Sequence, residues 1–214
     1  SLVYYLLDNE LCSELLVVDD LSTGFVENLP KDKNIELLIE KIQNVDENIF
    51  DKKYDGIFHL AAQASVPISI DDFYASSKNN LNSTLRVWDI AKKIDVPVVY
   101  ASSSAVYGNL PIGNDEDETV EILSPYAHDK LTMEHYARLC WDIYGVPSAG
   151  LRFFNVYGPR QDPSNPYSGV ISIFIDRLLK KMPVIVNGGY QTRDFIFVGD
   201  AVKIIHQTML LLNN

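Results

Sequence analysis

Short apolar runs alternate with longer stretches of helical periodicity along most of the chain. The apolar runs span residues 14–18, 56–60, 96–101 and 148–154, and each ends in small or polar residues. Apolar positions recur at helical spacing over residues 80–94, 126–144 and 170–179. Strands that alternate with helices form parallel sheets with both faces covered. The pattern therefore predicts an α/β fold built on a doubly wound parallel sheet.

The first residues do not supply the elements that normally open such a domain. Residues 2–7 predict the body of a first helix, and the strand that follows ends at Asp19. No G-x-x-G-x-x-G run is present in the sequence. We therefore expect the first strand of the sheet, with its phosphate-binding turn, to be missing.

The sequence changes character after the last of the four apolar runs. Gly158-Pro159, Asp162-Pro163 and Asn165-Pro166 follow in close succession, which indicates loops. We expect an incomplete nucleotide-binding domain over residues 1–154 and part of a smaller substrate-binding region over residues 155–214. Ligands of open α/β sheets bind at the carboxyl ends of the strands, where this sequence gathers its small and polar residues.

Composition and charge exclude several classes of partner. Lys and Arg number 18 against 29 Asp and Glu, which gives a net charge of −11. Nucleic-acid binding needs clustered basic residues, so no nucleic-acid partner is expected. No apolar run reaches the roughly 20 residues that span a bilayer, so no membrane association is expected. Cys12 and Cys140 lie far apart without metal-ligand spacing, which indicates a reducing compartment and predicts a cytoplasmic protein.

Several other conspicuous residues are assigned structural places. The acidic residues 115–118 are expected to form a solvated loop without a metal. His59, at the end of an apolar run, is expected to be a packed and hydrogen-bonded ring, and His128 is expected at the surface. Trp88 and Trp141 fall on predicted helices and are expected in the core.

Tyr126 and Lys130 are four residues apart on a predicted helix, so both side chains lie on one face. A surface tyrosine that covers a lysine stem would show the same spacing, and the pair alone does not decide between the two interpretations. Catalysis would need a phenolate, and lowering the pKa of a tyrosine from about 10 to about 7 takes roughly 4 kcal/mol. An adjacent ammonium can supply part of this stabilisation, and the phenolate can then remove a hydroxyl proton.

Three serines, Ser102, Ser103 and Ser104, follow the apolar run that ends at residue 101. A serine at the end of a strand can hydrogen-bond a substrate hydroxyl and pass its proton to a phenolate. A serine-rich turn after the strand is the structural alternative.

Six motifs stand in one order along the chain: VDDLSTG at 18–24, HLAAQ at 59–63, SSSAVYG at 102–108, SPY at 124–126 with Lys130, LRFFNVYGPR at 151–160 and QTRDFI at 191–196. Together they resemble the extended short-chain dehydrogenase/reductase family, and within it the UDP-glucose and UDP-N-acetylglucosamine 4-epimerases. The resemblance runs along essentially the whole chain. It implies a Rossmann-like fold and NAD as the cofactor.

The resemblance also implies roles for single residues. Tyr126 would be the catalytic base, Lys130 would lower its pKa and hold the nicotinamide ribose, and Ser103 would shuttle the proton. Asp19 would bind the adenosine ribose hydroxyls, which favours NAD over NADP. The other residues expected at the cofactor are Ala61, Ala62, Gln63 and Asn80, and those expected at the substrate are Ser103, Ser104, Asn155 and Arg193.

The two residues after Ser103 distinguish among the reactions of the family. Dehydratases place Asp-Glu there and decarboxylases keep a Glu at the second place, whereas this chain has Ser104-Ala105. The resemblance thus implies NAD-dependent 4-epimerisation of a UDP-sugar through a transient 4-keto intermediate, by an enzyme that is a homodimer when complete. The alternatives are another nucleotide-sugar enzyme of the family, such as a uronate epimerase or a dehydratase, and a truncated, inactive fragment. The identity of the sugar stays open.

Overall fold

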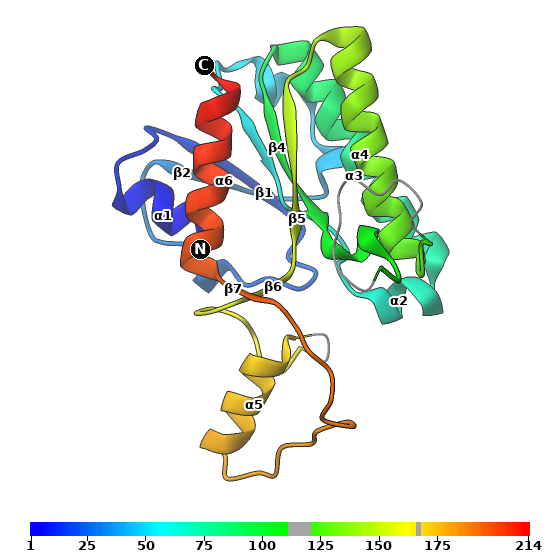
Figure 1. Cartoon of the computed structure of the whole chain (residues 1–214). Coiled ribbons are helices and arrows are strands. Elements are labelled where there is room, and N and C mark those ends of the chain that lie inside the picture. The colour runs from blue at the N-terminus through cyan, green and yellow to red at the C-terminus, as the bar shows by residue number, and fades with distance from the viewer. Residues whose placement is uncertain (111–120, 166–167) are drawn as a thin grey trace. The chain divides into compact units, whose positions relative to one another are not determined.

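The computed structural model describes residues 1–110, 121–165 and 168–214, and the predicted acidic loop at 115–118 lies outside these ranges. Figure 1 shows the elements along the chain. The helices are α1 (Leu2–Asp8), α2 (Val66–Asp71), α3 (Phe73–Ile94), α4 (Pro125–Tyr144), α5 (Val170–Leu179) and α6 (Val198–Leu212). The strands are β1 (Leu15–Asp19), β2 (Ile35–Ile39), β3 (Ile57–His59), β4 (Val98–Ser103), β5 (Ser148–Phe153), β6 (Asn155–Tyr157) and β7 (Phe195–Phe197). Short 3-10 helices are η1 (Val26–Asn28), η2 (Ile42–Asn44), η3 (Glu47–Asp51) and η4 (Ser104–Tyr107).

The chain folds into two compact units, each built from segments that are distant in sequence. The first unit comprises Ser1–Leu16, Leu21–Glu36 and Phe154–Ile204. The second unit comprises Val17–Asp20, Leu37–Phe153 and Ile205–Asn214. The predicted roles of residues 1–154 and 155–214 stay predictions, because a grouping of the backbone does not test what either part binds.

Three parallel strands form the sheet of the second unit, in the order β3-β4-β5. β4 pairs with β5 along its whole length, with Ser103 opposite Phe153, and with β3 as far as the pair of Tyr100 and His59. Helices α3 and α4 lie side by side against this sheet (Figure 1). Because the strands are parallel, the segments that follow β3 and β4 leave the sheet at the same end, the carboxyl end of the strands.

The core of the second unit lies between this sheet and helices α3 and α4. Trp88 of α3 packs edge-on against Tyr100 of β4, with ring centroids 5.1 Å apart. Gly150 of β5 leaves room for the Tyr100 ring, since a Cβ atom on this glycine would lie 2.5 Å from the tyrosine Cζ. The other buried members of the cluster are Val87, Ala91, Val96, Val98, Met133, Ala137, Cys140 and Val146. Burial of each larger aliphatic side chain contributes roughly 1.5–3 kcal/mol to the free energy of folding.

The first unit contains a smaller parallel sheet, formed by β6 and β7. Asn155 pairs with Phe195, and Tyr157 pairs with Phe197. The ring of Tyr157 also contacts both phenylalanines, with centroids 6.3 Å and 5.8 Å away. These aromatic contacts hold the two short strands together.

The predicted elements agree well with the structure. The α/β class with parallel strands is confirmed, and the first helix, the four apolar strands and the three helical stretches are present where the periodicity places them. The described strands form three sheets, β1-β2, β3-β4-β5 and β6-β7. Within the described ranges, no helix combines the length and apolar character needed to cross a bilayer.

The two tryptophans differ in how they are placed. Trp88 is buried, as predicted, but the prediction for Trp141 is wrong, because its side chain is 52% exposed. The buried stripe of α4 passes through Met133, Ala137 and Cys140. Trp141 lies one position beyond Cys140, which turns it about 100° around the helix and away from that stripe.

Candidate active site

Helix α4 carries Tyr126, Lys130 and Glu134 at intervals of one turn, so the three side chains share one face. Ser124 begins the helix, because its Oγ accepts a hydrogen bond of 3.2 Å from the backbone N–H of Ala127. Pro125 occupies the first helical position, where no N–H donor is needed. Tyr126 and Lys130 are only 8% and 2% exposed. The pair is therefore buried, and the interpretation as a surface tyrosine over a lysine stem does not hold.

Lys130 lies between the ring of Tyr126 and the end of β4. Its Nζ donates a hydrogen bond of 2.7 Å to the carbonyl oxygen of Ala101 and lies 5.8 Å from the centroid of the tyrosine ring. Burial lowers the pKa of Lys130 to about 8, and the nearby carboxylate of Asp129 opposes this shift. The ammonium form therefore prevails at neutral pH but is lost at mildly alkaline pH.

Ser103 is the serine of β4 that reaches Tyr126. Burial raises the pKa of Tyr126, and a hydrogen bond between its side chain and that of Ser103 acts in the opposite direction. Ser103 Oγ also accepts a hydrogen bond of 3.1 Å from the backbone N–H of Ala105, which holds the hydroxyl in place. The structure thus brings together the three predicted catalytic residues, Ser103, Tyr126 and Lys130, while the roles assigned to them stay predictions.

Ser102, the residue before Ser103 on β4, contacts a different residue of α4. Its hydroxyl donates a short hydrogen bond to Glu134 Oε1. Glu134 also accepts two hydrogen bonds from Arg152, at 2.9 Å and 2.7 Å, and the guanidinium stacks 4.8 Å from the centroid of the Tyr107 ring. Burial would raise the pKa of Glu134, but the hydrogen bonds from Arg152 and Ser102 outweigh it and lower this pKa.

Asn80 braces the loop after β3 against α4. Its side chain accepts a hydrogen bond of 2.8 Å from the backbone N–H of Gln63 and donates one of 3.1 Å to Asp129 Oδ2. Both Asn80 and Asp129 are almost completely buried, at 1% and 3% exposure. The buried carboxylate of Asp129, the residue before Lys130, is therefore hydrogen-bonded to Asn80 of α3.

The loop after β3 contains three residues predicted to contact the cofactor. Gln63 uses its side-chain amide within the chain, donating to the carbonyl of Ser65 at 3.2 Å and accepting from Ser76 at 3.0 Å. Ala61 is exposed and Ala62 is half-buried. The two alanines therefore offer an approachable backbone at the edge of the sheet, whereas the side chain of Gln63 stabilises the loop itself.

His59 is a packed ring, as predicted. It is 4% exposed, its Nε2 lies 3.5 Å from Thr84 Oγ1, and its ring packs edge-on against Trp88. Burial, together with the charge of Lys130, lowers the pKa of His59 to about 3. The imidazole is therefore neutral at physiological pH. His128, by contrast, is exposed on α4, as predicted.

The remaining predicted site residues lie at strand ends or in loops. Asp19 ends β1 with an exposed side chain, and its carbonyl accepts a hydrogen bond of 3.2 Å from the N–H of Glu40. Ser104 is half-buried at the start of η4. Asn155 and Arg193 belong to the first unit, where both are exposed. The side-chain amide of Asn155 donates a hydrogen bond of 2.8 Å to the carbonyl of Asp194, next to Arg193 in sequence.

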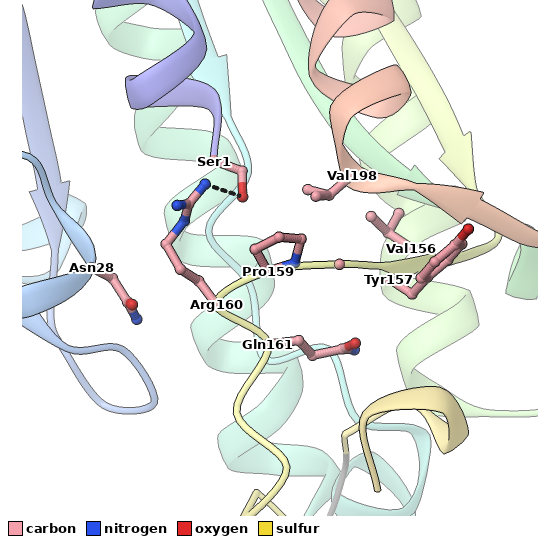
Figure 2. Close-up of a pocket in the computed structure, with 9 residues that line it drawn as sticks. Ser1, Asn28, Val156, Tyr157, Pro159, Arg160, Gln161 and Val198 are labelled. Carbon is pink, nitrogen blue, oxygen red and sulfur yellow. Dashed lines mark hydrogen bonds between the residues drawn. The ribbon is translucent and has the colours of Figure 1, made fainter. Parts of the chain in front are cut away.

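The first unit contains a cavity of about 310 Å³, shown in Figure 2. Arg160 reaches from its rim to Ser1 Oγ at 3.4 Å and stacks 4.3 Å from the centroid of the Tyr4 ring. The other lining residues are Asn28, Val156, Tyr157, Gly158, Pro159, Gln161 and Val198. This lining contains none of the residues that the sequence analysis assigns to catalysis.

A serine, a tyrosine and a lysine gathered at the end of a parallel strand, in a Rossmann-like α/β unit, define a protein of the short-chain dehydrogenase/reductase type. Residues 1–213 match the NAD-dependent epimerase/dehydratase family, and the chain belongs to this family. NAD is accordingly the cofactor, and solved relatives contain it.

Named relatives include several sugar-nucleotide epimerases. A putative UDP-glucose 4-epimerase of Methanocaldococcus jannaschii is 39% identical over 197 residues, which cover 89% of this chain and 63% of the relative. The solved UDP-N-acetylglucosamine 4-epimerase of Methanobrevibacter ruminantium, in complex with UDP-N-acetylmuramic acid, has a TM-score of 0.89 at 36% identity and covers 98% of this chain and 68% of its own. The UDP-glucuronic acid 4-epimerase of Bacillus cereus, with UDP-glucuronic acid and NAD, has a TM-score of 0.82 at 30% identity and covers 94% and 66%. The chain thus spans about two thirds of the length of these relatives.

Residues at the ends of β1 and β3, together with Lys130 of α4, fit NAD as a ligand. The Lys130 ammonium carries three N–H donors, and one of them is used by Ala101 among the described residues. Further donors are therefore available for ribose hydroxyls. Ala61 and Ala62 present only methyl groups at the sheet edge, so a planar ring system can approach the backbone there. The exposed carboxylate of Asp19 suits a second pair of ribose hydroxyls.

Several residues that support the catalytic cluster were not predicted from the sequence. Glu134 continues the series of Tyr126 and Lys130 by one further turn, a spacing that was available in the sequence. Asp129 and Ser69 carry no such signal, because their contacts join segments far apart along the chain. Arg152 belongs to a quoted motif, but its partner Glu134 becomes evident only when β5 is placed next to α4.

Proposed function

We propose that the protein to which this chain belongs catalyses NAD-dependent 4-epimerisation of a UDP-linked sugar through a transient 4-keto intermediate. The observation that carries the proposal is the buried cluster in which Lys130 faces the ring of Tyr126 and Ser103 is hydrogen-bonded to its phenol. The relatives named above, with UDP-sugars in their names or in their structures, support the choice of substrate class.

The three side chains divide the proton chemistry among them. Tyr126 takes the proton of the sugar 4-hydroxyl as the C4–H bond breaks, and Ser103 bridges the sugar hydroxyl and the phenol. The Lys130 ammonium stabilises the phenolate that Tyr126 must form, which offsets the effect of burial on its pKa. NAD, when bound, supplies the reversible hydride acceptor. After the keto sugar has rotated in the site, a C4–H bond forms again on the opposite face of C4 with the returning hydride, and Tyr126 gives the proton back to the 4-oxygen.

Elimination of water is disfavoured by the residues around Ser103. A dehydratase needs an acid and a base beside the sugar ring, but Ser104 and Ala105 supply neither. Glu134 is the carboxylate that shares a helix face with Tyr126, and Arg152 and Ser102 already occupy its oxygens. Net redox-neutral inversion at C4 is therefore the reaction that these side chains support.

The UDP portion is assigned to residues of the first unit. Asn155 and Arg193 are exposed there, and an arginine suits a diphosphate because its guanidinium donates two parallel hydrogen bonds. In the second unit, Ser103 and Ser104 are proposed to contact the sugar, and Asp19, Ala61, Ala62, Gln63, Asn80, Tyr126 and Lys130 to surround or support the NAD site.

The proposal is tested by product analysis with the complete protein. UDP-glucose, UDP-galactose and their N-acetylated counterparts are incubated with NAD, and the products are separated by chromatography. Interconversion of a 4-epimer pair without net NADH formation is expected. Net NADH formation or a 4-keto-6-deoxy product would contradict epimerisation.

A uronate 4-epimerase is a second candidate function. The specific observation in its favour is the structural likeness to the UDP-glucuronic acid 4-epimerase of Bacillus cereus. Adding UDP-glucuronic and UDP-galacturonic acid to the same panel separates the two candidates by the ratio of their kcat/KM values.

The isolated chain needs a test of its own, because a truncated, inactive fragment is the remaining alternative. Calorimetric titration of the 214-residue chain with NAD, beside the complete protein, answers this question. Binding by both at micromolar concentrations supports a functional cofactor site in the chain. Binding by the complete protein alone supports the fragment interpretation.

We also propose a cytoplasmic homodimer without a nucleic-acid partner. The net charge of −11 supports the absence of nucleic acid, and the two free cysteines are consistent with a reducing compartment. Light scattering of the complete protein measures the oligomeric state.

A further inference from the structure

Ser69 lies on α2 and makes a hydrogen bond to the backbone of the proposed catalytic base. Its side chain is completely buried, at 0% exposure. The hydroxyl donates to the carbonyl of Val66 at 2.7 Å and accepts from the backbone N–H of Tyr126 at 3.1 Å. A single hydroxyl therefore joins α2 to the first turn of α4, across 57 residues of sequence.

The first turn of α4 explains why this contact is needed. The first N–H groups of a helix have no partner within the helix and must find one elsewhere. In α4, Pro125 has no N–H, and Ser124 accepts from Ala127 in the local manner of a helix cap. The N–H of Tyr126 is left for Ser69, because Tyr126 is buried and excludes water.

Further hydrogen bonds connect Ser69 to the loop that follows β3. The backbone N–H of Ser69 donates to the carbonyl of Ser65 at 3.1 Å, and Gln63 Nε2 donates to the same carbonyl at 3.2 Å. Gln63 is in turn held by Asn80 through its backbone. A continuous path of hydrogen bonds thus runs from the loop that carries Ala61 and Ala62, through α2, to Tyr126. In Figure 1, α2 lies beside the N-terminal end of α4, in agreement with these contacts.

We propose that Ser69 is a positioning residue, which holds the backbone of Tyr126 so that its phenol meets Ser103 and Lys130. The inference rests on the proposed function for the role of Tyr126, and it adds that α2 sets the position of the base. Ser69 itself touches no reacting atom. It acts because a displacement of about 1 Å at a reacting group can cost about 100-fold in rate.

The central test compares Ser69→Ala with Ser124→Ala in the complete protein. Both variants remove one hydroxyl that accepts from the first turn of α4, but only Ser69 binds the N–H of Tyr126. Ser69→Ala is expected to lower kcat about 10- to 100-fold with little change in KM. Ser124→Ala is expected to lower the Tm about as much as Ser69→Ala does, but to change kcat less than about 3-fold.

A second readout does not depend on turnover. Tyrosine labelled with ¹³C at Cζ gives one signal per residue, and the signal of Tyr126 is assigned by its absence in Tyr126→Phe. Ser69→Ala is expected to shift the titration of this signal to higher pH, because the hydrogen bond with Ser103 weakens, whereas Ser124→Ala leaves it in place. This titration remains informative even if the complete protein is not an epimerase.

Two further variants address folding and rescue. Ser69→Thr keeps the hydroxyl, and a helical threonine commonly bonds a carbonyl one turn back, as Ser69 does, so kcat is expected to recover in large part. Ser69→Cys fills the space that alanine would leave with a thiol, which is a weak hydrogen-bond acceptor. This variant replaces Ser69→Ala in the test if Ser69→Ala does not fold. Equal losses of kcat in the Ser69 and Ser124 variants, or an unchanged Tyr126 titration in Ser69→Ala, would overturn the proposal.

Discussion

The Lys130 ammonium donates a hydrogen bond of 2.7 Å to the carbonyl oxygen of Ala101, two residues before Ser103 on β4. The partner of the proposed base is thereby attached to the strand that carries the proposed proton shuttle. Because β4 is the central strand of its three-stranded sheet, this acceptor is held rigidly. The position of the charge relative to Tyr126 therefore depends on the sheet as well as on α4.

The pH dependence of turnover follows from the buried lysine. Burial lowers the pKa of Lys130 to about 8, so its positive charge is present below that pH and is lost above it. Activity is expected to fall on the alkaline side as the phenolate of Tyr126 loses this stabilisation. The charge of Asp129 raises the pKa of Lys130, so Asp129→Asn should move the alkaline limb of kcat to lower pH. Steady-state rates between pH 6 and pH 10 give the shift.

Asp142→Asn is the matched control, since it makes the same change at an exposed position of the same helix. Within the described ranges, Tyr126 and His59 also face Lys130, and His59 is neutral with a pKa of about 3. An alkaline limb that is the same in Asp129→Asn and in the parent would refute the electrostatic role of Asp129.

Removal of the Tyr126 hydroxyl tests the proposed base directly. General acid–base catalysis contributes about 10²- to 10⁴-fold, so Tyr126→Phe should lower kcat by at least 100-fold. Nucleotide affinity should change less than about 3-fold, because phenylalanine keeps the ring that packs beside Lys130. Calorimetry with NAD and with UDP measures the binding, and turnover near the parental value would exclude Tyr126 as the base.

Part of this site can be predicted from the sequence, because some of its residues lie close together along the chain. Tyr126 and Lys130 are visible as an i, i+4 pair, and the motif at residues 102–108 indicates Ser103. Ser69 and Asp129 are not predictable in this way, because their hydrogen bonds span 57 and 49 residues and depend on how α2, α3 and α4 pack. Strands β1, β3, β4 and β5 coincide with the predicted apolar runs and α3 and α4 with predicted helical stretches, whereas β6 and β7, of three residues each, lie outside them.

The ion pair of Glu134 and Arg152 is expected to stabilise the end of β5 against α4. The two side chains are 19% and 30% exposed, and the pair is bidentate, so it should contribute more than a surface ion pair. Glu134→Gln should lower the free energy of unfolding by about 1–3 kcal/mol. Asp176→Asn, which breaks the more exposed pair with Lys180, should cost less than about 1 kcal/mol. Urea unfolding measures the free energy of unfolding of both variants. Equally small losses would show that the pair of Glu134 and Arg152 contributes no more than an exposed ion pair.

Gly150 is expected to be intolerant of any side chain. A Cβ atom there would lie 2.5 Å from Cζ of Tyr100, and this ring is held in turn by Trp88. Gly150→Ala should therefore cost about 1–3 kcal/mol through overpacking, with a fall in Tm of roughly 2–4 °C for each kcal/mol.

A double-mutant cycle identifies the clash as the cause of this loss. Tyr100→Leu removes the ring that the new methyl group would meet, so adding Gly150→Ala to it should cost less than adding the same change to the parent. The coupling arises because the strand pairing brings Gly150 directly opposite Tyr100. Strictly additive losses in calorimetric Tm and urea unfolding would show that the space that Gly150 leaves to Tyr100 is not the cause of the loss.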